Sequence, residues 1–271
     1  MIPQTLPTSA QPIATDTWLI PTLAAEPSGL YFAAHSLVIR GTEPVIVDTG
    51  CSLVREAWLE QVFAVVEPDD VRWVFLSHDD HDHIGNLDVV LERCPNATLV
   101  ANFSIVARLM GDVELPLGRM RWLDAGQSLD AGDRTLTAVR PPMFDSPATR
   151  GLYDSSTGLL WAVDSFGSFF PGEVYEAADV PAEIYDGSFG VLNAWNTPWL
   201  EWIDAERFAA HVRATASLPL DVVASAHGPV LRGPQIADAF DRTLALAGQP
   251  VPPAPGQDVL DHLVATLLAA A

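Results

Sequence analysis

One short segment, residues 77–86, constrains this chain more than any other. It reads SHDDHDHIGN and places three histidines and three aspartates in six consecutive positions, although the whole chain has only seven histidines. An apolar run at residues 71–76 precedes it and a helical pattern follows at residues 87–91, which predicts a loop between a buried strand and a helix. Neutral histidine nitrogens and aspartate oxygens together suit iron, manganese or zinc. We therefore predict a metal site in this loop.

Three further metal-binding side chains follow strand signals elsewhere in the chain. They are Asp145, Asp164 and His227, and the last two directly end the apolar runs at residues 159–163 and 222–225. A carboxylate at the end of an apolar strand is unfavourable unless it is paired or metal-bound. A metal centre shared with residues 77–86 explains all three, although a turn or cap role stays open for Asp145.

The spacing of these residues resembles that of metallo-β-lactamase-fold proteins. Their hallmark, H-x-[HED]-x-D-H after a strand, is met by His78, Asp80, Asp82 and His83, and a V-D-T-G turn precedes it at residues 47–50. The resemblance covers residues 37–230 and implies an α/β (α+β) fold, a four-layer αββα sandwich with a two-metal site at one edge. It also implies that Asp164 bridges the two metals, that His227 is the last histidine ligand, and that Asp48 steadies the loop from behind the ligands.

Within that superfamily the chain is most similar to flavodiiron proteins and their stand-alone oxygen-binding diiron relatives. Asp80 stands where hydrolases carry a second histidine, as a carboxylate does in this branch. Two departures are visible. Asp145 occupies a position where the branch usually has histidine, and no flavodoxin domain or flavin motif is present in the chain. The resemblance therefore implies a separate electron-donor protein.

The complete predicted ligand set holds two metal ions. It comprises His78, Asp80, Asp82, His83, Asp145, Asp164 and His227. Four anionic oxygen donors favour iron, with manganese or zinc as alternatives, and open positions would remain for a small molecule. Asp82 and Asp164 are the predicted catalytic carboxylates.

Several residues are expected around the metals without binding them. His81 lies between the ligand positions and should point away, while His35 precedes a strand and can reach the pocket. Residues 166–202 are rich in aromatic side chains, which predicts a long loop with its own apolar anchor. The alternative is an apolar wall over the metals, to which Phe166, Trp195 and Trp199 would contribute.

Composition excludes several classes of partner and chemistry. The chain has 35 acidic and 14 basic residues, for a formal net charge of −21, which disfavours nucleic acid and anionic membranes as partners. It contains no lysine, so Schiff-base chemistry is excluded. Its two cysteines, Cys51 and Cys94, are too few for a disulfide scaffold or an iron–sulfur cluster.

The predicted organisation is one main domain with a short C-terminal addition. Residues 1–249 form the metallo-β-lactamase-fold domain, residues 250–257 a proline-rich linker, and residues 258–271 a helix that docks on the domain or on a partner in a homodimer. No apolar run is long enough to span a bilayer and no secretory signal is visible. The expected location is cytoplasmic.

Three functions remain open at this point. The first is a diiron oxidoreductase that activates or reduces O2 or a related small molecule with an external electron donor. The second is a two-metal hydrolase of an ester, lactone or thioester. The third is an oxygen-binding sensor without catalytic activity, because a fold does not determine a function.

Overall fold

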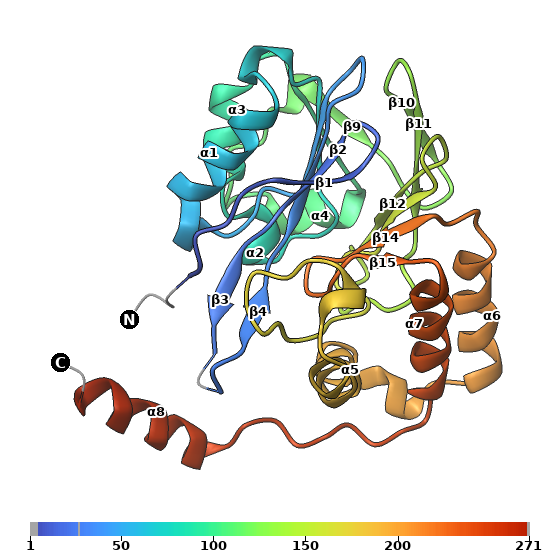
Figure 1. The fold of residues 1–271 in the computed structure, drawn as a ribbon. Coiled ribbons are helices and arrows are strands. Elements are labelled where there is room, and N and C mark those ends of the chain that lie inside the picture. Colours follow the sequence, from blue (N-terminus) through green and yellow to red (C-terminus); the bar gives the residue numbers. More distant parts are fainter. Residues whose placement is uncertain (1–4, 27, 270–271) are drawn as a thin grey trace.

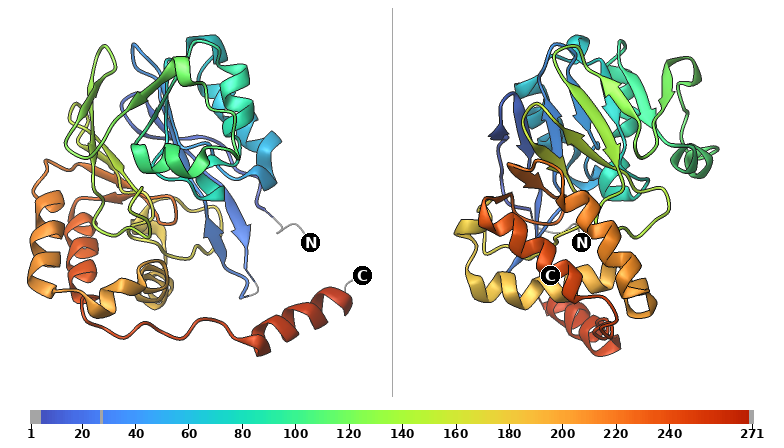
Figure 2. Two further views of the ribbon diagram at one scale, coloured as in Figure 1. Left: turned by 180° about the vertical axis from the view of Figure 1, so that it is seen from behind. Right: turned by 90° about the vertical axis from the view of Figure 1, so that its right-hand side faces the viewer.

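Two β-sheets lie face to face, and helices cover the outer face of each sheet (Figures 1 and 2). The computed structural model describes residues 5–26 and 28–269. The first sheet has the strand order β1-β2-β5-β6-β7-β8-β9 and the second β10-β11-β12-β13-β14-β15, while β3 and β4 form a separate hairpin. This arrangement confirms the predicted four-layer αββα sandwich.

The strands are short and come from most of the chain. The first sheet contains β1 (Gln11–Ala14), β2 (Thr17–Ile20), β5 (Ser36–Ile39), β6 (Val45–Val47), β7 (Trp73–Phe75), β8 (Thr98–Ala101) and β9 (Met120–Trp122). The second contains β10 (Ser128–Asp130), β11 (Thr135–Val139), β12 (Gly151–Asp154), β13 (Leu159–Trp161), β14 (Val222–Ala224) and β15 (Leu231–Arg232). The hairpin strands are β3 (Leu23–Ala25) and β4 (Tyr31–Ala33).

The helices divide between the two outer layers. The first layer contains α1 (Arg55–Val65), α2 (His81–Ile84), α3 (Leu87–Arg93) and α4 (Phe103–Leu109). The second contains α5 (Ala182–Asn196), α6 (Ala205–Ala216) and α7 (Pro234–Ala245), and α8 (Gln257–Ala269) follows at the C-terminal end. Single 3-10 turns are η1 (Ser52–Val54), η2 (Pro68–Asp70), η3 (Leu117–Arg119), η4 (Ala177–Asp179) and η5 (Pro198–Trp202).

Strand periodicity explains why both faces of each sheet are buried. In β5, Leu37 and Ile39 enter the core between the sheets, while Val38 packs against the helices of the first layer. In β13, Trp161 enters the same inter-sheet core and Leu160 packs against the second helical layer. Because successive side chains point to opposite faces, a run without polar residues must be covered on both sides.

One predicted element was wrong. Residues 166–202 were expected to form a long loop, but they contain α5, a helix of 15 residues. Its two interior glycines, Gly187 and Gly190, lower its intrinsic helix propensity. Tertiary contacts compensate, since Phe189 is buried and Asn193 exchanges side-chain hydrogen bonds with the backbone N–H and carbonyl of Gly167.

The C-terminal helix lies apart from the four layers. An extended, proline-rich segment at residues 250–256 leads from the body to α8, which projects beyond it in both views (Figures 1 and 2). Its side chains Val259, Leu260 and Val264 are exposed. Residues 1–4 of the predicted domain and 270–271 of the predicted helix lie outside the described residues. Among the described residues, no helix combines the length and apolarity needed to cross a bilayer.

Candidate metal centre

All seven predicted ligands come together at one edge of the sandwich, where loops leave the strand ends. The loop after β7 and the short helix α2 supply His78, Asp80, Asp82 and His83; the β11–β12 loop supplies Asp145; and the segments after β13 and β14 supply Asp164 and His227. The carboxyl ends of β6 and β7 and those of β13 and β14 point the same way, because each pair is parallel. Residues distant in sequence therefore meet at this edge.

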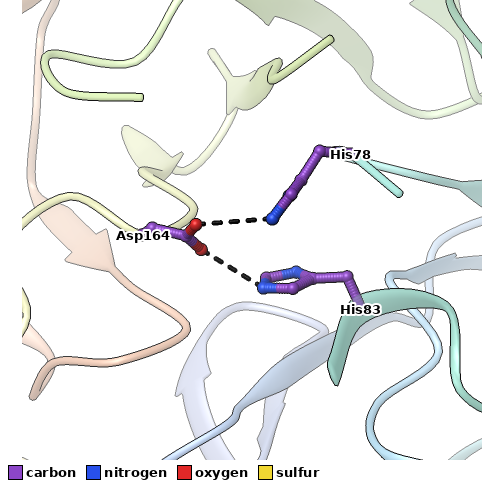
Figure 3. A group of neighbouring side chains, drawn as sticks. All are labelled: His78, His83 and Asp164. Carbon is purple, nitrogen blue, oxygen red and sulfur yellow. Dashed lines mark ion pairs between the residues drawn. The ribbon is translucent and has the colours of Figure 1, made fainter. Parts of the chain in front are cut away.

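The seven side chains form two groups that share Asp164. Ligand atoms of His78, Asp80 and Asp145 lie within 4.8 Å of one another, and so do those of Asp82, His83 and His227. Asp164 lies between them: its Oδ2 is 3.4 Å from His78 Nε2 and its Oδ1 is 3.2 Å from His83 Nε2 (Figure 3). Oδ1 also lies 3.3 Å from His227 Nε2.

Three buried atoms in this cluster have no hydrogen-bond partner: His78 Nε2, His83 Nε2 and Asp164 Oδ1. A buried polar atom without a partner is strongly unfavourable. Two ligands of one ion, each bound at about 2.0–2.2 Å, stand about 2.8–3.6 Å apart in octahedral or tetrahedral geometry. The separations of 3.2–3.4 Å around Asp164 have this value, so the residues present fit two metal ions better than direct hydrogen bonds.

Each of the three imidazoles is oriented by a hydrogen bond at its other nitrogen. His83 Nδ1 donates to Asp48 Oδ2 over 3.0 Å, and His227 Nδ1 donates to the Ala33 carbonyl over 2.7 Å. His78 Nδ1 lies 3.0 Å from Ser77 Oγ. Because a carboxylate and a carbonyl only accept, Nδ1 of His83 and of His227 carries a proton, and in the neutral imidazole, the form that binds a metal, Nε2 keeps a free lone pair. The lone pair faces the site.

Asp48 anchors the whole loop from behind. This fully buried carboxylate accepts hydrogen bonds from Ser77 N at 2.7 Å, Ser77 Oγ at 2.8 Å and Trp161 Nε1 at 3.1 Å, in addition to His83. Its φ of +60° is a left-handed conformation that aspartate tolerates better than most residues. The supporting roles of Ser77 and Trp161 carried no signal in the sequence.

The electrostatics favour positive charge at the centre of the cluster. Burial alone would raise the pKa of Asp164, but His78, His83 and His227 hold it well below its usual range. Burial alone would lower the pKa of His83, but Asp82, Asp164 and Asp48 hold it well above. For Asp145, burial raises the pKa and the nearby charge of Asp164 raises it further. A carboxylate-rich site of this kind stabilises cations.

Backbone strain surrounds Asp164. Val163 and Phe166 both have positive φ, +55° and +69°, which is unfavourable for residues with a bulky side chain and clusters at functional sites. The turn is clamped to the His227 segment, because Ser225 Oγ and Ala226 N donate to the Val163 carbonyl. A Cβ atom at Gly228 would collide with the Phe166 carbonyl oxygen, so only glycine fits there.

Two cavities open onto the metal ligands. The larger, about 390 Å³, is lined by Asp80, Asp82, Asp164 and His227 on one side and by apolar side chains on the other, namely Ala24, Phe32, Ala34, Leu53 and Val54. The smaller, about 250 Å³, shares Asp164 and His227 and adds Leu192 and Trp195.

The ring of Phe32 stacks on His227 with centroids 4.7 Å apart. Asn196 lines both cavities and its Nδ2 donates to Asp164 Oδ2 over 3.4 Å.

Only one of the four predicted pocket residues lines these cavities, and it is Trp195. Phe166 is buried in the core against Phe240, and Trp199 lines a different cavity beside Phe144. His35 is buried with its Nδ1 accepting from Thr22 N and its ring edge-on to Phe170. The sequence places these residues near the site but does not tell which way each side chain points, so three of the four predicted pocket residues do not line the cavities. His81 is exposed at the start of α2.

Comparison with known proteins agrees with the fold. A family model described as ODP family beta lactamase matches residues 32–228. A putative diflavin flavoprotein A 1 from Nostoc sp. is 26% identical over 202 residues, which cover 73% of this chain and 33% of that protein. An anaerobic nitric oxide reductase flavorubredoxin from Pectobacterium atrosepticum is 24% identical over 200 residues, covering 73% and 39%.

Solved structures share the architecture at low sequence identity. The flavodiiron protein from Giardia intestinalis superposes with a TM-score of 0.73 at 20% identity, over 89% of this chain and 59% of that one. Rubredoxin oxygen:oxidoreductase from Desulfovibrio gigas gives a TM-score of 0.76 at 17% identity, over 89% and 62%. The match to the diflavin flavoproteins spans about a third of their length, 33% and 34% in two of them.

Proposed function

The chain belongs to the ODP family beta lactamase group, and from this premise we propose that it is a diiron oxidoreductase that binds and reduces O2 or a related small molecule. Nitric oxide is such a molecule, since it is named in the description of the flavorubredoxin relatives. In this proposal, electrons reach the site from a separate donor protein. The family membership supports the fold that surrounds the site, and the histidine and aspartate donor atoms support the assignment of bound metal ions.

The observation that carries this proposal is the composition of the ligand cluster. Four of its seven side chains are aspartates, and Asp164 presents one oxygen to each group of ligands. Carboxylate-rich sets favour iron or manganese over zinc, which prefers sulfur and nitrogen in closed tetrahedral sites. Seven ligands for two ions leave positions open for a small molecule.

The residues of the chain perform distinct tasks in this proposal. Asp164 would hold both ions, and the hydrogen bonds at Nδ1 of His83 and His227 orient the two rings so that each Nε2 could bind an ion. The apolar walls at Phe32 and Leu53 limit water in the cavity next to the metals. Two bound iron ions would supply the electrons that reduce the small molecule.

A hydrolase is the second candidate, and the size of the larger cavity favours it. A volume of about 390 Å³ lies in the range of pockets that hold organic ligands, about 300–1,000 Å³. In this function, water activated at the site would attack an ester, lactone or thioester carbonyl. No described arginine lines that cavity, so an anionic substrate would find no guanidinium group there to pair with.

Metal analysis and two activity assays separate these functions. We expect protein grown with iron and zinc both present to contain two metal ions per chain with iron in excess, measured by elemental analysis. Iron-loaded protein should consume O2 only when a chemical reductant or reduced flavoprotein is added. Zinc alone in the purified protein would contradict the iron assignment.

A panel of neutral lactones, esters and thioesters provides the complementary test. We expect little hydrolysis from the iron-loaded protein. Rapid hydrolysis that is lost in His227→Ala would establish the hydrolase instead. A reversible change in the optical spectrum with O2 but no turnover of either kind would establish an oxygen-binding sensor.

A further inference from the structure

A third cavity, of about 480 Å³, lies on the second helical layer, and none of the proposed metal ligands lines it. We call it the α6 cleft. Its lining residues come from the loop after β11, from η5, from α6 and from the connection between η5 and α6: Arg140, Phe144, Trp199, Trp202, Ile203, Asp204, Arg207, Phe208 and His211. Nothing in the proposed function uses it.

The α6 cleft is cationic on a strongly acidic molecule. Arg140 and Arg207 both line it, and neither forms an ion pair among residues 5–26 and 28–269. Among the described residues that line it, Asp204 is the only carboxylate, and its Oδ1 already accepts from the backbone N–H of Arg207 as the α6 cap. By contrast, the cavity at Arg40 and Arg72 is also lined by four acidic residues, Glu43, Glu67, Asp69 and Asp70. With a net charge of −21, a cleft in which arginines outnumber carboxylates is distinctive.

Arg140 is half-buried, and it forms no ion pair among the described residues although the charge of Asp124 acts on it. Burial lowers the pKa of its guanidinium, and repulsion from Arg150 lowers it further. Arg150 is itself paired with Asp124 at 2.6 Å, so that carboxylate is already engaged. An anion bound beside Arg140 would supply the missing partner.

Aromatic rings form the remaining wall. Trp202 is 79% exposed, which leaves a large apolar side chain in water without a packing partner. Trp199 and Phe144 lie with ring centroids 5.1 Å apart, and the Arg140 guanidinium sits 4.9 Å from the Phe144 centroid. Exposed indole rings stack readily on flat aromatic ligands.

We propose that the α6 cleft binds a planar aromatic anion, an aromatic ring that carries a phosphate, as in a mononucleotide. The guanidinium groups of Arg140 and Arg207 bind the phosphate and Trp202 stacks on the ring. The cleft volume of about 480 Å³ accommodates a ligand of that size. This site is independent of the metal centre and extends beyond the proposed function.

The position of the cleft decides which probe is most informative. Trp199 Nε1 donates to the Phe144 carbonyl over 2.8 Å, and Phe144 directly precedes Asp145, a proposed metal ligand. A redox-active ring in the cleft would therefore lie against the loop that reaches the metals. We choose flavin mononucleotide as the probe, with adenosine monophosphate as an aromatic phosphate without redox chemistry.

The test is a binding titration of the full chain at about 0.15 M salt, where long-range repulsion is screened beyond about 8 Å. We expect flavin mononucleotide to bind at least about 10-fold more tightly than riboflavin, which lacks the phosphate, and than inorganic phosphate, which lacks the ring. Adenosine monophosphate binding equally well would assign the site to aromatic mononucleotides in general, and weaker binding would assign it to flavins. Riboflavin binding as tightly as flavin mononucleotide, or no binding of either nucleotide, would overturn the proposal.

Matched variants locate the binding. Arg207→Gln and Trp202→Ala change exposed side chains of the cleft and should each weaken nucleotide binding about 10-fold. Arg213→Gln, on the same helix, and Trp122→Ala, an exposed indole outside the cleft, should leave it unchanged. Thermal melting confirms that all four variants fold. Equal affinities for cleft and control variants would show that binding occurs elsewhere and would refute the assignment.

Discussion

At the scale of single residues, Asp164 carries more of the site than any other side chain. Its two oxygens face different imidazoles, His78 at 3.4 Å and His83 at 3.2 Å, and the turn that presents it is strained on both sides. A carboxylate that binds two ions contributes to the affinity of both. Mutations here should therefore affect both metals together.

We predict that Asp164→Ala reduces the metal content from two ions per chain to one weakly held ion or none. The reason is the loss of a donor whose two oxygens face both groups of ligands. Elemental analysis after desalting measures the result, and Asp241→Ala, at an exposed position on α7, serves as the control. Two ions retained at wild-type affinity would show that Asp164 does not bridge.

Asp48→Ala should have a milder effect on the same measurement. It removes the acceptor that orients His83 but no metal ligand, and such supporting groups typically contribute about 10–100-fold in metal affinity. Asp48→Asn preserves the volume and distinguishes lost charge from a cavity. A loss as complete as that in Asp164→Ala would assign Asp48 a direct role.

His35 predicts a pH dependence of folding stability. Burial, and then the nearby His227, lower its pKa to about 3 in the folded protein, compared with about 6.5 when unfolded. Below pH 6.5 the folded state binds fewer protons at His35 than the unfolded state does. The stability that neutral His35 contributes is therefore fully present above pH 6.5 and is lost as the pH falls towards the folded-state pKa. Between pH 7 and pH 5 the loss amounts to about 2 kcal/mol.

Urea unfolding of metal-depleted protein at both pH values measures this loss. His35→Asn cannot become charged and keeps an acceptor for the Thr22 N–H. The wild-type protein should therefore lose about 2 kcal/mol more than the variant. Equal losses in the two proteins would show that His35 is not the group responsible.

At the scale of elements, strand ends build the site and helices cover the sheets, but α8 does neither. Its side chains Val259, Leu260 and Val264 are exposed, and Figure 1 shows it beyond the body. The two sequence-based alternatives, docking on the domain or on a second copy of the chain, give different experimental results. Truncation separates them.

We predict that deleting residues 257–271 changes the Tm by less than about 2 °C, because surface segments contribute little to stability. The deletion keeps the hydrogen bond from Trp195 Nε1 to the Pro252 carbonyl. Calorimetry gives the Tm, and light scattering gives the oligomeric state. A lower Tm in a monomer would show that α8 docks on the body, whereas a dimer that dissociates on truncation would identify α8 as its contact.

At the scale of the whole molecule, we expect metal binding and folding to be coupled across the two halves of the sandwich. The ligands come from both sheets, and without metal ions four aspartates crowd one edge. A chelator should therefore lower the Tm. Each bound ion contributes about 3 kcal/mol when free metal exceeds its Kd by about 100-fold, equivalent to several degrees.

Scanning calorimetry with and without chelator checks this expectation, and readdition of iron should restore the Tm. The Asp164→Ala variant is the matched control, because its Tm should respond little to chelator. An equal response in the variant and the wild-type protein would mean that the chelator acts elsewhere.

The sequence by itself determined the fold class and the identity of the candidate ligands. Alternating and continuous apolar runs report which strand faces are buried, and residues 77–86 place histidine and aspartate where a strand ends. The tertiary structure alone decided how those residues meet. Asp48 and Trp161 are 113 positions apart yet share a hydrogen bond, and Asn193 stabilises α5 through Gly167, 26 positions away. Local periodicity carries no information on such distances, because they depend on how the two sheets and their helices pack. For the same reason, the α6 cleft and the apolar cavity beside the metals were visible only in three dimensions.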